Sequence, residues 1–305
     1  MSAVESRSRT EEELRRALSA GREAGRRHCL RLPAESLRGP AGARLGAHAG
    51  ASLDFHDYRD YQPGDDLRNL DWNVYARSDR EVVKLHREEI APRLDVFLDV
   101  SRSMAVADDS DGGPFGKAAS SLMLAVACCV AAEAAQCSHA VWPLRDDLSP
   151  LRGSSGAVED WAIPAFDADE PPSALFRRAA ARWRRNGVRM LVSDLMWRED
   201  PSLALSVLAD GAASLLVVQL LATEEAAPTF GGQYKLTDSE TGDELDVFVD
   251  DMTRAAYLAA LGRHRTQWQT ACRRFGAQFV SLTTDTLLEG GRLAALERCG
   301  FLEAQ

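Results

Sequence analysis

Short apolar runs typical of buried strands alternate with helical patterns from residue 93 onward, and this alternation most restricts the possible fold. The strand-like runs are LDVFLDV (94–100), VRMLVSDL (188–195), SLLVVQLLA (214–222) and QFVSLTT (278–284). Helical patterns lie between them, the longest being FGKAASSLMLAVACCVAAEAAQC (115–137). Strands alternating with helices build a parallel sheet that is covered by helices on both faces. We therefore expect a doubly wound, mostly parallel α/β domain over residues 93–305.

Two further patterns lie inside this domain. HAVWPL (139–144) and LSPLRG (148–153) predict two short strands that pair across a turn near Asp146. The polar segment YKLTDSETGDELDVFV (234–249) predicts a hairpin that turns at residues 241–243.

The first 92 residues have a different character. Thr10 and Glu13 predict a capping box at the start of a charged helix, and a Gly/Ala/Arg-rich stretch follows as far as Gly50. We expect residues 1–50 to form an N-terminal helix and a peripheral tail. Residues 51–92 concentrate aromatic and charged residues around a turn at Pro63 and end in EVVKLHREEI, which alternates as a half-buried strand does. A small β-containing segment is therefore expected before the main domain.

Composition restricts the partners and the compartment. The formal net charge of -10 argues against general nucleic-acid affinity, which depends on phosphate neutralisation by Lys and Arg. The most apolar run, LMLAVACCVAA (122–132), is about half as long as a membrane span requires, so we expect a buried helix and no span. The N-terminus is charged where a signal peptide is apolar, and the six cysteines form no Cys-x-x-Cys pair. These features predict a cytoplasmic protein.

Oxygen-bearing side chains follow two of the expected strands. Asp99, Ser101 and Ser103 come directly after the first buried run, and Asp194 ends the VRMLV run. If these strands are neighbours, the side chains meet where ligands bind in doubly wound sheets, outside the carboxyl ends of the strands. Carboxylates and hydroxyls are suitable ligands for a hard cation such as Mg²⁺ or Mn²⁺. The alternative interpretation is that Asp99 only caps the following helix.

These residues also carry a family resemblance. DVSRSM (99–104) followed by VSDL (192–195) resembles the metal-ion-dependent adhesion site of von Willebrand factor type A domains. The upstream segment SLDFHDYRDYQPGDDLRNLDWNVYARSDREVVKLH (52–86) resembles the signature of the bacterial family labelled domain of unknown function fifty-eight, which carries such a domain. The resemblance implies a von Willebrand factor A-like fold for residues 93–305.

The resemblance also assigns roles to individual residues. It implies that Ser101 and Ser103 contact the metal directly, whereas Asp99 and Asp194 act directly or through water. Sites of this type also use a Thr from an intervening loop, and the nearest hydroxyls here are Ser154 and Ser155.

A function follows from the same resemblance. Because few direct carboxylates leave the cation incompletely neutralised, its last ligand would be an Asp or Glu of a protein partner. Members of the family typically occur with MoxR-type AAA+ ATPases, which implies an adaptor or chaperone-like role in assembling or activating other proteins. The chain has neither a P-loop nor a Gly-x-Ser-x-Gly elbow, so we expect no enzyme. Metal-assisted phosphoryl transfer, or an interaction domain with a vestigial metal site, are the alternatives.

Overall fold

The computed structural model describes residues 3–33, 54–62, 65, 70–87, 93–106, 115–145, 148–170, 172–179, 183, 185–288 and 290–305. It divides the chain into two units. We call Met1–Leu32 together with Pro92–Gln305 the α/β unit, and Pro33–Ala91 the small unit.

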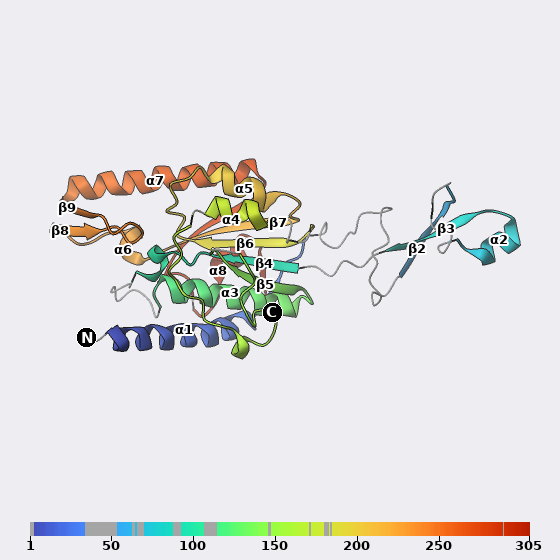
Figure 1. Ribbon diagram of the computed structural model, residues 1–305, viewed down its shortest axis with the longest axis horizontal. Helices are drawn as coiled ribbons and strands as arrows, with labels where there is room; N and C mark the ends of the chain where they lie inside the picture. Colours follow the sequence, from blue (N-terminus) through green and yellow to red (C-terminus); the bar gives the residue numbers. More distant parts are fainter. Residues whose placement is uncertain are drawn as a thin grey trace. The chain divides into compact units, whose positions relative to one another are not determined.

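A five-stranded, wholly parallel sheet forms the centre of the α/β unit (Figure 1). The strands are β4 (Arg93–Leu98), β5 (Ser138–Pro143), β6 (Val188–Ser193), β7 (Ser214–Leu221) and β10 (Gln278–Thr283), in the order β10-β7-β6-β4-β5. The chain winds outward in both directions from the β4–β6 pair, so the winding direction reverses between these two strands. The predicted α/β class with a parallel sheet flanked by helices is confirmed.

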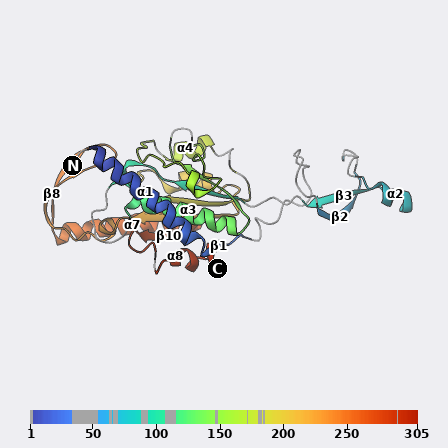
Figure 2. The same ribbon diagram turned by 90° about the horizontal axis from the view of Figure 1, so that it is seen from below.

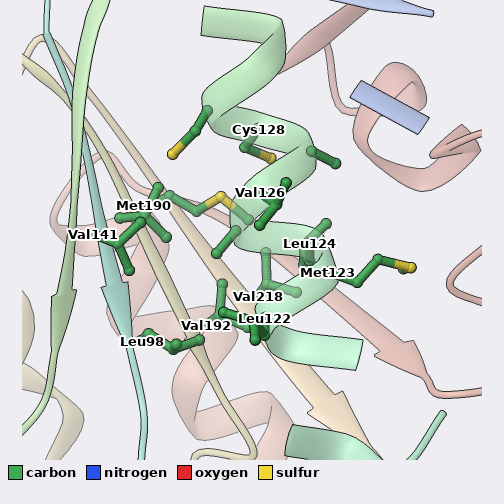
Figure 3. Packing of buried hydrophobic residues seen from close by; sticks show 14 of the residues in the cluster. Leu98, Leu122, Met123, Leu124, Val126, Cys128, Val141, Met190, Val192 and Val218 are labelled. Carbon is green, nitrogen blue, oxygen red and sulfur yellow. The ribbon is translucent and has the colours of Figure 1, made fainter. Parts of the chain in front are cut away.

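Helix α3 (Lys117–Ala134) covers one face of the sheet, and α1 (Ala3–Gly25) lies against the outer side of α3 (Figure 2). Leu98, Val192 and Val218 of the sheet pack against Leu122 and Val126 of α3 (Figure 3). Since α3 lies between the sheet and α1, it is apolar on nearly all sides. By length and composition α3 is the one described helix able to cross a membrane, yet most of it is buried inside this unit.

Helices α4 (Pro172–Ala179), α5 (Pro201–Ala209) and α7 (Asp251–Arg274) cover the opposite face (Figure 1). Aromatic side chains dominate this second layer of the core. Phe97 of β4 packs edge-on against Phe176 and Trp183, with ring centroids 5.7 and 4.8 Å apart, and Trp268 of α7 is fully buried. Two apolar layers therefore hold the sheet in place from both sides.

The N-terminal helix belongs to the α/β unit, which differs from the peripheral tail expected for residues 1–50. Leu14, Ala17 and Leu18 of α1 are buried, and Gly21 and Gly25 let the helix approach α3 closely. Strand β1 (His28–Leu30) then pairs antiparallel with β11 (Leu302–Ala304), which follows α8 (Ala294–Arg298). The sequence pattern did not reveal this because α1 is polar overall and much of its buried face consists of small residues, which give a weak hydrophobic signal. Residues 34–53 lie outside the described residues.

Two local predictions within the domain have different outcomes. LSPLRG forms an irregular segment that ends in a turn rather than a strand, and β5 pairs in parallel with β4 instead of forming a hairpin. The predicted polar hairpin is confirmed: β8 (Gly232–Thr237) pairs antiparallel with β9 (Glu244–Val249). The other elements that the structure describes in this unit are η2 (Arg102–Ala105), η3 (Val158–Asp160) and α6 (Thr223–Ala226).

The small unit contains the β structure expected for it. Strands β2 (Asp54–Asp60) and β3 (Val82–Arg87) pair antiparallel, and α2 (Trp72–Ser78) lies between them in the chain. Asp71 caps α2 by accepting hydrogen bonds from the backbone N–H groups of Asn73 and Val74, at 2.9 and 3.3 Å. The predicted turn at Pro63 lies outside the described residues.

Candidate functional site

The sheet topology places the loops of four predicted oxygen ligands side by side. β4 and β6 are hydrogen-bonded neighbours, and Asp99, directly after β4, donates its backbone N–H to Val192 of β6 at 2.9 Å. Asp194 follows the end of β6. The loops carrying Asp99, Ser101, Ser103 and Asp194 therefore emerge side by side at the switch point of the sheet, where doubly wound domains bind their ligands.

Asp99 is buried and held by three hydrogen bonds. Its Oδ1 accepts from the Ser101 backbone N–H at 3.0 Å, while its Oδ2 accepts from Ser193 Oγ at 2.5 Å and from Trp197 Nε1 at 3.1 Å. Burial raises the pKa of Asp99, and the nearby Asp194 carboxylate raises it further, although the hydrogen bonds from Ser193 and Ser101 oppose the rise. Burial and the Asp194 carboxylate thus both disfavour the charged form of Asp99.

The two serines lie at the start of the turn that follows Asp99. Ser101 precedes η2 and Ser103 lies within it, and their hydroxyl oxygens are 3.1 Å apart. The backbone N–H of Ser103 donates to Glu240 Oε1 at 2.8 Å. The alternation Asp-x-Ser-x-Ser therefore brings the two hydroxyls together beside the Asp99 loop.

Asp194 already has a cationic neighbour, which the sequence interpretation missed. Lys117, the first residue of α3, is buried, and its Nζ lies 3.2 Å from Asp194 Oδ2 and 2.5 Å from Glu225 Oε1. Burial alone lowers the pKa of Lys117, but the Asp194 and Glu225 carboxylates outweigh this effect and raise it overall. Asp194 Oδ1 accepts from the Met196 backbone N–H at 3.1 Å.

The charges and donors at the site fit a hard cation. The Asp194 and Glu225 carboxylates both contact the Lys117 ammonium, so two acidic groups share one cationic group and negative charge remains in excess. Oxygen donors of this kind suit Mg²⁺ or Mn²⁺. Because Asp194 already pairs with the Lys117 ammonium, whereas the described residues form no ion pair with Asp99, Asp194 would act through water. Among the described residues, no three His, Cys, Asp or Glu side chains are arranged so that they alone could hold a metal ion, so such a site would need the two serine hydroxyls.

Of the two hydroxyls expected from the intervening loop, that of Ser154 has another role. Ser154 is buried, and its Oγ accepts from the backbone N–H of Val141, in the middle of the edge strand β5, at 3.2 Å. Ser154 therefore provides a hydrogen-bond acceptor for a backbone N–H group at the edge of the sheet. Ser155 is exposed in the same turn, and neither residue forms a described hydrogen bond to the Asp99 loop.

Further site residues come from distant parts of the chain. Ser193, next to Asp194 in VSDL, orients Asp99, and its position at the end of a strand was the available signal. Lys117 was detectable as a charge opening an otherwise apolar helix. Glu225 and Glu240 lie in short polar segments after β7, and nothing in the local sequence distinguishes them from other surface glutamates.

Comparisons with known proteins identify relatives of unknown function. The model of the family described as "Protein of unknown function DUF58" matches residues 57–267. Uncharacterized proteins of Mycobacterium bovis and Mycobacterium tuberculosis are each 27% identical over 285 residues, which cover 86% of this chain and 84% of the relative.

Two solved structures are also similar. An aerotolerance-related membrane protein from Bacteroides fragilis, with multiple mutations to serines, has a TM-score of 0.39 and 11% identity, covering 69% of this chain and 98% of that chain. The conserved hypothetical protein BatB from Bacteroides thetaiotaomicron has a TM-score of 0.31 and 10% identity, covering 63% of this chain and 90% of that chain.

Proposed function

The chain belongs to the family of proteins of unknown function DUF58, and we propose that it is a non-enzymatic adaptor that binds an acidic residue of a protein partner through a divalent cation. The main support is the convergence of Asp99, Ser101, Ser103 and Asp194 on the switch point between β4 and β6. The excess of negative charge around Lys117 supports the same proposal.

The chemistry of the ligands explains why a partner carboxylate is the expected target. A bound Mg²⁺ or Mn²⁺ would supply a positive charge that one carboxylate and two hydroxyls neutralise only in part. Asp99 would provide the direct charge, Ser101 and Ser103 the neutral oxygens, and Asp194 a hydrogen-bonded water. An Asp or Glu of another protein would then complete the ligand shell.

The nature of the partner rests on the sequence resemblance. The likeness of DVSRSM and VSDL to the von Willebrand factor A metal site supports recognition of a protein. The family resemblance supports a MoxR-type AAA+ ATPase in the cytoplasm as that partner, and assembly or activation of other proteins as the outcome.

The test is calorimetric titration of Mn²⁺ and Mg²⁺ into protein freed of metal by a chelator. The wild type is compared with Asp99→Ala and Ser103→Ala, and Ser155→Ala serves as the matched serine control outside the site. We expect saturable binding in the wild type and the control, and loss of binding in the two site variants. Circular dichroism verifies that each variant is folded.

Partner binding is then measured with an immobilised MoxR-type ATPase from the same organism, with and without chelator. The proposal predicts that chelator and Asp99→Ala each abolish the capture. Folded wild type that binds neither metal, together with capture that persists in chelator, would contradict the proposal.

A further inference from the structure

The tip of the β8–β9 hairpin reaches the candidate site. The hairpin lies next to α6 at one end of the α/β unit (Figure 1). Asp238 organises its tip, because the Asp238 Oδ1 accepts from the backbone N–H groups of Glu240 and Thr241 at 2.8 and 3.2 Å. Gly242 completes the turn with a φ of +76°, in the left-handed region that glycine adopts without strain. The turn thereby fixes the direction in which the side chain of Glu240 points.

The side chain of Glu240 reaches the loop that carries Ser101 and Ser103. Glu240 Oε1 accepts from the Ser103 backbone N–H at 2.8 Å, and the Glu240 backbone carbonyl accepts from Arg102 Nη1 at 3.2 Å. Arg198, in the loop after β6, lies 3.4 Å from Asp238 Oδ2. The tip therefore contacts the loops after both β4 and β6, which carry the candidate metal ligands.

Among the described residues, the rest of the hairpin has its contacts with the α/β unit near its base. Side chains along both strands are exposed or half-buried except that of Val249. At the base, Thr253 Oγ1 of α7 donates to the Phe248 carbonyl at 3.2 Å, and Arg254 Nη2 donates to the Phe230 carbonyl at 2.9 Å. The tip can thus leave the site without exposing the core of the α/β unit.

We propose that Glu240 is an internal stand-in for the partner's acidic residue, so that the hairpin tip keeps the site closed until a partner carboxylate displaces it. This inference rests on the proposed function and adds its regulation. A tethered carboxylate has a high effective concentration at its target, so a free carboxylate binds only to the fraction of molecules in which the tip is open.

The test uses Mn²⁺ with acetate as the free carboxylate. Water-proton relaxation reports water next to Mn²⁺, and acetate lowers it by replacing that water. Glu240→Ala is compared with the wild type and with Glu244→Ala, a matched change on the same hairpin whose carboxylate pairs with Lys235 at 2.7 Å. We expect acetate to act on Glu240→Ala with an apparent affinity about tenfold tighter than on the other two proteins.

The three possible results separate the two proposals. Tighter acetate binding in Glu240→Ala alone supports the proposed role of Glu240 in closing the site. Mn²⁺ binding by all three proteins with equal sensitivity to acetate overturns this inference and leaves the metal site intact. Absence of Mn²⁺ binding from all three folded proteins overturns the proposed function, and the inference with it.

Discussion

Replacement of Lys117 by methionine tests the electrostatic balance of the site. Methionine preserves most of the volume and removes the charge, leaving Asp194 buried without its counterion. At 3.2 Å, the attraction between Lys117 and Asp194 is about 5 kcal/mol if the effective dielectric constant is about 20. The buried carboxylate keeps its desolvation cost in the variant, so we expect Lys117→Met to lower the free energy of unfolding by about 3–5 kcal/mol.

The assay is urea unfolding at pH 7 in chelator, followed by tryptophan fluorescence and circular dichroism. Lys235→Met is the matched control, because Lys235 forms an exposed pair with Glu244 whose loss costs at most about 1 kcal/mol. Adding Asp194→Asn to Lys117→Met is expected to restore at least half of the lost stability, since it removes the unpaired charge. A loss below about 1 kcal/mol in Lys117→Met, or additive effects in the double variant, would refute the reasoning.

Two further predictions concern the α1–α3 contact and the ionisation of Asp99. A Cβ at Gly21 would lie 2.4 Å from the Met123 carbonyl oxygen, so Gly21→Ala should lower the unfolding free energy by about 1–3 kcal/mol. Gly262→Ala, on an open face of α7, should raise it by up to about 1 kcal/mol, and equal effects would show that α1 is not packed there. Burial, and to a lesser extent the Asp194 carboxylate, raise the pKa of Asp99 above 3.8 in the folded state. The folded state therefore binds the Asp99 proton more tightly than the unfolded state does, and the stability gained in this way is lost as pH rises through the raised pKa. In chelator, the stability of the wild type relative to Asp99→Asn should therefore increase from pH 7 toward pH 4, and a constant difference would contradict this assignment.

The strands and the main helices were predictable because their signals are local. A parallel strand buried on both faces, such as β4 or β7, appears in the sequence as a continuous apolar run. A helix enclosed on all sides, such as α3, is apolar all round. Segments with a weaker local signal were predicted less well. The sequence of β5 suggested one strand of a hairpin, but β5 pairs in parallel with β4. The segment of α1 was assigned to a peripheral region, because the small residues that pack against α3 give little hydrophobic signal.

The candidate site likewise has a part that could be predicted from the sequence and a part that could not. Asp99, Ser101 and Ser103 form a local motif, and Asp194 follows a strand whose character is evident, so the sequence by itself determined these four positions and the chemistry of their oxygens. Their convergence depended on β4 and β6 being neighbours, which is a property of strand order.

Only the tertiary structure decided which charges surround those oxygens. Lys117 meets Asp194 across 77 residues of the chain, and Glu240 meets Ser103 across 137. Ser154, which the sequence offered as a ligand, is instead bonded to the edge of the sheet. Hydrophobic periodicity specifies which face of an element is buried, but electrostatic pairs depend on distances that exist only after the elements have packed.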